Sequence, residues 1–328
     1  MKKGKNEFII FITFTTLFIL ILDPKSAIDG ASKGIELCLK TLVPALFPFM
    51  IISECCGMLL FGLRSSVLRK LMKPCKLPNG SEIIYMLGLL SGYPIGAKII
   101  SDAYNENLIK KNDANHMLRF CNNAGPSFIF GILGSMFSQP LMPWIIWEIH
   151  IFSAYLVGVF TAKAESTNDL SIPAKSFHFS KTVPAAVKTM GNVCGWVVLF
   201  RVILSFFKKW FFFFFPMPFQ VLLSGLLELS NGCIQLAEIK NVYEKFIISV
   251  FLISFGGFCV TMQTASLIPA GTVKYYLSGK LYQCLIALIL SIPVIILMEN
   301  LSICFLILPI FCLFIFKIWC VVKSAKKQ

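Results

Sequence analysis

Residues 83–100 read IIYMLGLLSGYPIGAKII, an apolar stretch interrupted at its centre by Ser91, Gly92 and Pro94. The stretch is nearly long enough to cross a bilayer, which takes about 20 residues. Glycine and proline weaken a helix, however, and proline also removes a backbone donor. Irregular backbone cannot face lipid, because its polar groups would find no partner there. We therefore expect a broken or re-entrant element that faces protein or an aqueous cavity.

The composition of the whole chain predicts a lipid environment. Of its 328 residues, 57% are hydrophobic and only 14% are charged, whereas about 25% of a soluble domain is charged. We therefore predict an all-α polytopic membrane protein whose partner is the lipid bilayer. The net charge of +14 lies mostly in short breaks between apolar runs, which is an orientation signal. No nucleic-acid partner is expected, because such proteins cluster their cations on a solvated face.

Apolar runs of spanning length continue on both sides of this segment. A second interrupted segment, residues 210–237, contains Pro216, Pro218 and the string LLSGLLELSNGCIQLA. The run at 8–22 follows a lysine-rich start and is interpreted as an uncleaved first helix, with a cleaved signal as the alternative. We expect about eight transmembrane helices plus two broken or re-entrant segments, or ten spans if the broken segments cross. The other runs are 41–63, 120–137, 141–161, 183–207, 246–268, 281–298 and 301–322.

The order of these elements repeats along the chain. A span, a broken segment and two further spans describe residues 41–161 and again residues 183–298. An odd number of true spans in each half predicts an inverted repeat. Interrupted segments at matching places in two halves indicate a binding site at mid-membrane. Two pairs of motifs match between the halves: LLSGYPIGA (89–97) with ELSNGCIQLA (228–237), and FCNNAGPSFIF (120–130) with FLISFGGFCVT (251–261).

The distribution of lysine and arginine gives a weak preference for this topology. With both termini in the cytosol, the basic loops 64–82, 162–182 and 271–280 are cytosolic, as the positive-inside rule requires. Five lysines then fall on the outer side, against this rule. They are Lys25, Lys33, Lys40, Lys208 and Lys209.

Polar residues at the breaks are the candidate binding groups. Lys98 either meets an anion or extends to the interface, and Arg119 either holds a carboxylate or sits at the head-group level. The asparagines at 122 and 123 either bind a ligand or cap a helix. The expected substrate-binding residues are Ser91, Gly92, Tyr93, Pro94, Lys98, Arg119, Asn122, Asn123, Gly125, Ser230, Asn231, Gly232 and Gln263.

Ionisable residues inside apolar runs are functional candidates, because burying a charge in a membrane is costly. Glu54 and Glu228 are the candidate coupling carboxylates. A structural ion pair is the alternative for Glu54, and a wet loop is the alternative for Glu228. Glu148 and His150 lie two residues apart, on different faces of a helix, so they form no ready-made couple.

No enzyme, cofactor or metal is expected. The sequence contains no nucleophile elbow, Walker A loop, HExxH or Rossmann glycine pattern. Its twelve cysteines are dispersed without CxxC pairs, and its three histidines are widely spaced. An intramembrane enzyme is therefore the weakest of the alternatives.

The motifs LLSGYPIGAK (89–98), RFCNNAGPSFIFGILG (119–134) and ELSNGC (228–233) resemble the sporulation integral membrane protein family (YlbJ type, SpoVV-like). That family is part of a wider group of gate-domain, or nucleoside-recognition, membrane proteins. The resemblance covers roughly residues 35–300. Together with the order of apolar runs, it predicts an N-terminal membrane anchor helix and loop, two gate-like repeats joined by a cytosolic linker, and a C-terminal helix with a basic tail. The corresponding ranges are 1–34, 35–163, 164–182, 183–300 and 301–328.

The resemblance also implies a role in endospore formation. Its members of the SpoVV type are held to move dipicolinic acid across the outer forespore membrane. We therefore expect a secondary permease with a small anionic substrate. The oligomeric state is left open, with a homo-oligomer as one alternative. A nucleoside or nucleobase transporter is the first alternative, since a neutral ligand has less need of Arg119 and Lys98. A non-transporting scaffold of the spore envelope is the second.

Overall fold

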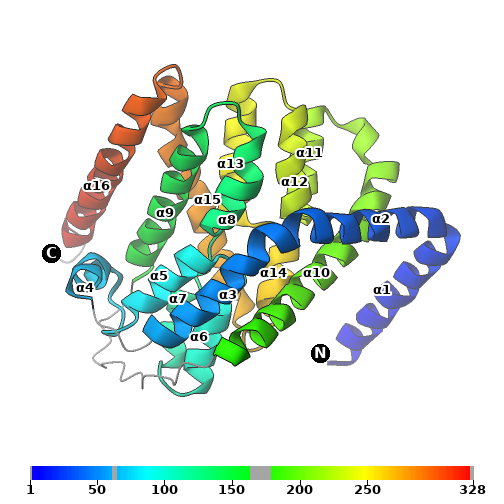
Figure 1. Cartoon of the computed structure of the whole chain (residues 1–328), viewed down its shortest axis with the longest axis horizontal. Helices are drawn as coiled ribbons and strands as arrows, with labels where there is room; N and C mark the ends of the chain where they lie inside the picture. The colour runs from blue at the N-terminus through cyan, green and yellow to red at the C-terminus, as the bar shows by residue number, and fades with distance from the viewer. Residues whose placement is uncertain (1, 61–64, 163–178, 326–328) are drawn as a thin grey trace.

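The computed structural model describes residues 2–60, 65–162 and 179–325 (Figure 1). Within these ranges the chain is almost entirely helical and contains no β-strand. The described residues include five segments long and apolar enough to cross a membrane: Pro24–Cys56, Met142–Phe160, Phe179–Trp210, Val242–Ala265 and Val273–Ile296. The prediction of an integral, multi-pass, all-α membrane protein is therefore confirmed.

Shorter apolar helices account for the difference from the eight spans expected. They are Thr13–Leu22, Glu82–Ser91, Pro126–Met136, Met217–Leu227 and Leu301–Leu313. Many large apolar side chains on the outer helices are exposed, including Phe11, Ile296 and Leu306. A bilayer covers such side chains, whereas in water they would form an aggregation-prone surface.

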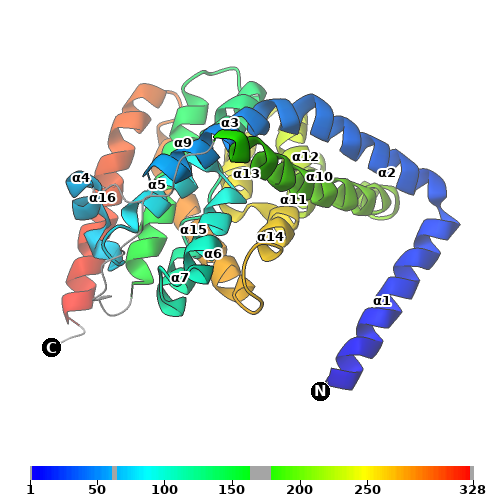
Figure 2. The same cartoon turned by 60° about the horizontal axis from the view of Figure 1, so that its bottom comes forward.

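The N-terminal arm is helical throughout its described length. Helix α1 (Lys2–Leu22) stands away from the other helices, whereas α2 (Pro24–Leu37) lies across them (Figure 2). The π-helical turn η1 (Cys38–Leu42) then leads into α3 (Val43–Leu60). Residues 24–34, expected as a loop, are therefore helical, because Pro24 and the side chain of Asp23 start a new helix there.

Two glycines bring α2 into close contact with α10 (Phe179–Trp210). A Cβ atom on Gly30 would lie 2.8 Å from the Cα atom of Val202, and Gly34 is similarly close to the same helix. The spacing is that of the small-xxx-small pattern, which lets helix backbones approach in membranes. The arm is thereby fixed along a helix of the second half.

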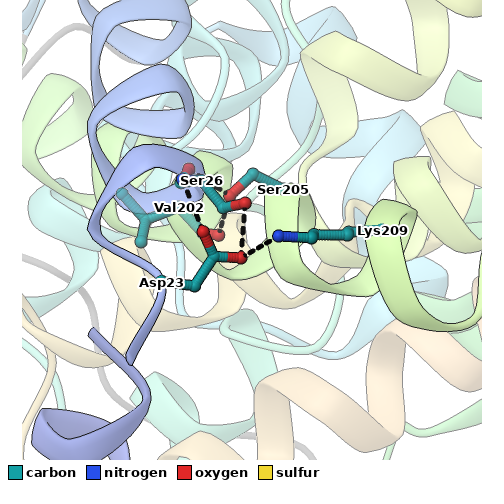
Figure 3. A network of polar contacts seen from close by, with 5 residues as sticks. All are labelled: Asp23, Ser26, Val202, Ser205 and Lys209. Atoms are coloured by element: carbon teal, nitrogen blue, oxygen red, sulfur yellow. Dashed lines mark hydrogen bonds and ion pairs between the residues drawn. The ribbon is translucent and has the colours of Figure 1, made fainter. Parts of the chain in front are cut away.

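A polar network closes one end of this contact (Figure 3). The Asp23 carboxylate accepts hydrogen bonds from the backbone N–H of Ser26 at 3.2 Å and from the Lys209 ammonium of α10. The Ser205 hydroxyl of α10 donates to the carbonyl of Ser26 at 2.7 Å. The Lys209 ammonium and the Ser26 hydroxyl together lower the pKa of Asp23 to about 2.

The first interrupted segment folds back on itself as a helical hairpin. Gly88 on one arm and Gly96 on the other both lie against the carbonyl oxygen of Cys121. A Cβ atom added to Gly88 would lie 1.9 Å from this oxygen, and one added to Gly96 would lie 2.3 Å from it. The segment is therefore a hairpin and not one continuous helix, and whether it crosses the membrane stays a prediction. The elements are α4 (Ser66–Met72), η2 (Lys73–Cys75), α5 (Glu82–Ser91) and α6 (Ile95–Asn105).

The next apolar run is broken as well. Residues 120–137, expected as one span, begin outside a helix, because residues 118–125 separate α7 (Lys111–Met117) from α8 (Pro126–Phe128). Pro126 favours a helix start and disfavours helical geometry in the residue before it. The run continues through η3 (Ile129–Leu133), η4 (Gly134–Met136) and then α9 (Met142–Phe160).

The second half repeats this order of elements. Helix α10 is followed by a second hairpin, in which a Cβ atom on Gly232 would lie 2.2 Å from the Cα atom of Gly225. A broken helix and a long helix complete the half. The elements are η5 (Phe212–Phe214), α11 (Met217–Leu227), α12 (Leu229–Gln235), η6 (Leu236–Glu238), α13 (Val242–Phe255), α14 (Gly257–Ala265) and α15 (Val273–Ile296).

The expected domain boundaries are only partly covered. The boundary at residue 34 falls inside α2, and most of the linker at 164–182 lies outside the described residues. Helix α16 (Leu301–Ala325) forms the C-terminal unit, whose last three residues also lie outside them. The inverted orientation of the two halves stays a prediction.

Candidate functional site

The tips of the two hairpins meet at one buried cavity. Its polar wall comes from both tips, from the break before α8 and from α14, and its apolar wall comes from η1, α3 and α10. The cavity has a volume of about 30 Å³, which is the space of one or two water molecules. The polar residues that line it are Ser91, Tyr93, Ser127, Glu228, Ser230 and Gln263.

The tip of the α5–α6 hairpin carries hydroxyl groups and no charge. Gly92 has φ +74°, and a Cβ atom on it would lie 2.8 Å from the backbone N of Gly125. Only glycine therefore fits this close approach. The buried hydroxyls of Ser91 and Tyr93 have no hydrogen-bond partner among the described residues. These two groups are available to a ligand.

The tip of the α11–α12 hairpin carries a carboxylate. Glu228 is 1% exposed and accepts from the backbone N–H groups of Ser230 at 3.0 Å and Asn231 at 2.7 Å. It thus caps the start of α12 with a charge of the favourable sign. Arg201 of α10 donates to the side-chain oxygen of Asn231, and it attracts Glu228 electrostatically. Glu228 is therefore a buried site residue and not a wet-loop residue.

The adjacent asparagines act within the protein. Asn122 accepts from the backbone N–H of Ala97 at 3.2 Å and donates to Thr264 at 3.0 Å. Asn123 donates to the carbonyl of Phe120 at 2.6 Å. Both side chains are fully buried and neither lines the cavity. They hold the break at residues 118–125 in place beside the first hairpin.

The cations expected to bind an anion lie away from the cavity. Lys98 forms an ion pair with Glu54, so the ion-pair alternative for Glu54 is the one the structure shows. Arg119 donates to Ser278 at 3.1 Å and lies over the ring of Tyr275, 5.3 Å from its centroid. Neither lines the space between the hairpin tips. These positions do not form the expected anion contact in this conformation.

The remaining predicted residues divide between the cavity and its supports. Gln263 lines the cavity and donates to the Cys259 sulfur at 3.3 Å. Gly232 packs against Gly225, and Pro94 is the residue that precedes α6. The structure brings together at the cavity seven predicted residues: Ser91, Gly92, Tyr93, Gly125, Glu228, Ser230 and Gln263.

Two basic residues of the interior were not predicted as site residues. Lys280, assigned to a cytosolic loop, is instead 1% exposed within α15. Arg201 lies within an expected span and was not singled out. Lys280 stands at the start of an apolar run. At such a position the sequence does not distinguish a lysine that extends to the membrane surface from one that is buried in the protein.

His150 is also part of the buried polar interior. Its Nε2 accepts from the backbone N–H of Ala124 at 3.0 Å, and its Nδ1 is 3.3 Å from the side-chain nitrogen of Gln283. One carboxylate oxygen of Glu148 has no hydrogen-bond partner among the described residues.

A basic groove of about 610 Å³ lies apart from the cavity. It is lined by α4, η2 and the loop before α5, including Glu82. Its cations attract anions toward this side of the protein. They are Arg69, Lys70, Lys73 and Lys76.

The chain is similar to the sporulation integral membrane protein YlbJ of Bacillus subtilis (strain 168). The two are 26% identical in an alignment 316 residues long, and the match covers 82% of this chain and 76% of that protein. No protein-family model matches the chain, and no solved structure matches it. The resemblance to sporulation membrane proteins of the YlbJ type, drawn from short motifs, is thereby confirmed along most of the chain.

Proposed function

We propose that this chain is a sporulation membrane permease that moves dipicolinic acid, a small aromatic dicarboxylate, across the outer forespore membrane. Transport is secondary, no enzyme chemistry is involved, and both termini lie in the cytosol. One observation carries the permease assignment: two hairpin tips, one helix break and helix α14, far apart in sequence, line one cavity that holds several polar groups. Broken helices around a central site are the construction of many secondary transporters. Similarity to a sporulation membrane protein supports the cellular setting.

The cavity must enlarge before it can bind a solute. Its volume of about 30 Å³ is far below the roughly 300 Å³ of a small-ligand pocket. The first tip meets the following break through Gly92 and Gly125, a contact without side chains. Separating these two segments also requires the hydrogen bond from the Ala97 N–H to Asn122 to break. We take this conformation as the closed state of the transport cycle.

The polar groups of the cavity restrict the charge that the cargo can carry. The free hydroxyls of Ser91 and Tyr93 can donate to a carboxylate. Glu228 repels a second one, because two like charges at low dielectric are strongly unfavourable. Dipicolinate therefore crosses either as a singly charged ion or together with a proton carried by Glu228. The basic groove at α4 concentrates the anion near the protein.

Uptake into proteoliposomes tests the proposal. Labelled dipicolinate should enter vesicles that contain the protein faster than empty vesicles, and an inward proton gradient should accelerate the entry. Tyr93→Phe should lower the uptake rate about tenfold, the effect of one lost hydrogen bond of about 1.4 kcal/mol. Tyr243→Phe, at an exposed tyrosine, is the matched control and should transport normally. Uptake no faster than in empty vesicles contradicts the assignment.

A neutral nucleoside or nucleobase is the second candidate cargo. It is favoured by the polar lining of the cavity, where the described residues supply hydroxyls, an amide and a carboxylate but no lysine or arginine. Unlabelled nucleosides should then compete with the label, and dipicolinate should not. A third result is a protein that transports neither solute while Tyr93→Phe cells still sporulate. That result favours a scaffold of the spore envelope.

A further inference from the structure

A lysine ammonium is buried against the non-helical residues 118–125. Gly279 of α15 touches this segment, since a Cβ atom there would lie 2.1 Å from the carbonyl oxygen of Arg119. The next residue, Lys280, is thereby placed in the interior, where it is 1% exposed. The close approach of α15 thus delivers a positive charge to the break.

The partners of this ammonium are neutral. Lys280 Nζ donates to Asn123 Oδ1 at 3.1 Å and to Gln283 Oε1 at 2.8 Å, and it lies 5.8 Å from the centroid of the Tyr276 ring. No carboxylate forms an ion pair with it among the described residues. A buried charge is normally paired, because removing it from water is costly. The position of Lys280 therefore calls for a reason beyond packing.

The contacts of Lys280 extend to three polar groups of the break, directly or through one or two neighbours. Asn123, which accepts from Lys280, also donates to the carbonyl of Phe120. Gln283 joins Lys280 to His150, which accepts from the backbone N–H of Ala124. The titratable neighbours are His150, Tyr276 and the thiols of Cys121 and Cys284.

Broken helices of transporters commonly hold a coupling cation. Helix ends leave carbonyl groups unpaired, and the carbonyls of unwound segments and half-helix ends coordinate Na⁺ or a proton. The break between α7 and α8 is such a place, and two amide oxygens there already face one positive charge. In this chain the positive charge belongs to a side chain, that of Lys280, and not to a bound ion.

We propose that the Lys280 ammonium takes the place of a bound alkali cation at the break between α7 and α8. The break is therefore formed without Na⁺. Transport, which rests on the function proposed above, also requires no Na⁺. Lys280 acts here as a positioning residue: it holds Asn123 and Gln283, and through them the segment that follows the first hairpin.

Thermal melting of the purified full-length protein tests this without any substrate. The fluorescence of its tryptophans is followed in detergent while NaCl replaces choline chloride at constant ionic strength. The wild-type melting temperature should not change. Lys280→Ala should melt lower in choline chloride, and NaCl should raise its melting temperature saturably by about 2–4 °C at ten times the dissociation constant. Propylammonium chloride, which carries the atoms that the substitution removes, should act in the same way.

Lys274→Ala, an exposed lysine of the same helix, is the matched control and should respond to no cation. Lys280→Met fills the space without charge, so it should melt lower and stay unresponsive. A saturable rise of the wild-type melting temperature in NaCl overturns the proposal. This measurement uses the wild-type protein alone. Lys280→Ala that melts like the wild type, or that neither Na⁺ nor propylammonium stabilises, overturns it too. Failure of solute uptake leaves these readouts unchanged, so the two proposals fail separately.

Discussion

The two hairpins reach the same cavity but are capped in different ways. At the α5–α6 tip, the N–H of Ala97 is satisfied from outside by Asn122, which is on the following segment. At the α11–α12 tip, Glu228 caps its own hairpin through two backbone N–H groups. The first tip is thus capped by a neutral side chain from the following segment, and the second is capped by a charged side chain of its own hairpin.

The packing of the two hairpins is nevertheless similar. Each leans on the break that follows it through glycines: Gly92 on Gly125 in the first half, and Gly225 against Gly257 in the second. The halves therefore share their backbone contacts and differ in their polar chemistry. Because Glu228 is the only carboxylate among the described residues that line the cavity, we expect the second hairpin to be the one that responds to the charge of a solute.

The largest effect is expected at the charged cap. Glu228→Ala leaves the buried N–H groups of Ser230 and Asn231 without their charged acceptor. An unpaired buried group costs about 1–3 kcal/mol with neutral partners and more when the lost partner is charged. The melting temperature of the purified protein and its yield in folded form measure the loss.

Glu228→Gln separates the charge from the cap. Glutamine keeps an acceptor for the N–H groups of Ser230 and Asn231 but not the negative charge. Its melting temperature should therefore fall between those of the wild type and Glu228→Ala. An alanine variant as stable as the wild type means that the second tip does not depend on Glu228.

The glycine contacts should give the next largest effect. In Gly88→Ala the new methyl group would lie 1.9 Å from the carbonyl oxygen of Cys121, so the hairpin must move away from the break. Overpacking of this kind costs up to about 3 kcal/mol. Gly191→Ala is the control, since no atom lies within 4 Å of the added Cβ. It should be neutral or slightly stabilising, because alanine favours a helix.

The neutral cap of the first hairpin should be less sensitive. Asn122→Ala leaves the N–H of Ala97 and the hydroxyl of Thr264 without their partner, which costs about 1–3 kcal/mol when such groups are buried. We expect the lower half of that range, below the loss in Glu228→Ala. Melting of the two variants side by side measures the difference between the hairpins.

Asn192→Ala is the control for this asparagine, because Asn192 bonds to Ser266 at the surface. It should change the melting temperature little. If Asn122→Ala is the more damaging of the two cap variants, the contrast between a neutral and a charged cap is wrong.

The breaks and their convergence could be predicted from sequence. Glycine and proline inside apolar runs have direct backbone consequences, so the interruptions at Gly92 and Pro94 were readable. The match between LLSGYPIGA and ELSNGCIQLA sets Ser91 opposite Ser230, and both residues line the same cavity. The role of this cavity as a binding site stays a prediction.

The partners of the charged residues could not be predicted. Arg201 and Lys280 lie in or beside apolar runs, and composition does not reveal which helix lies across from them. Lys98 was expected at the ligand, but its partner Glu54 is 44 residues away in sequence. One missed signal was readable: Gly30 and Gly34 have the small-xxx-small spacing, in a stretch treated as a loop.

The smallest effect concerns a partly exposed counterpart of the Glu228 cap. Asp23 also caps a helix and also faces a cation of α10, Lys209. These contacts hold its pKa at about 2, below the ordinary 3.8. Because the folded pKa is the lower one, the contribution of Asp23 to stability is complete above about pH 5 and is lost as the pH falls toward about 2.

Asp23→Asn isolates this contribution from the other carboxylates. The difference in melting temperature between the wild type and Asp23→Asn should be small at neutral pH and should vanish on acidification. It should also shrink at high salt, because the ion pair is exposed. The Glu228 cap is buried, so the loss in Glu228→Ala should persist in salt. If salt weakens both caps equally, burial does not distinguish them, and the second hairpin tip is open to water.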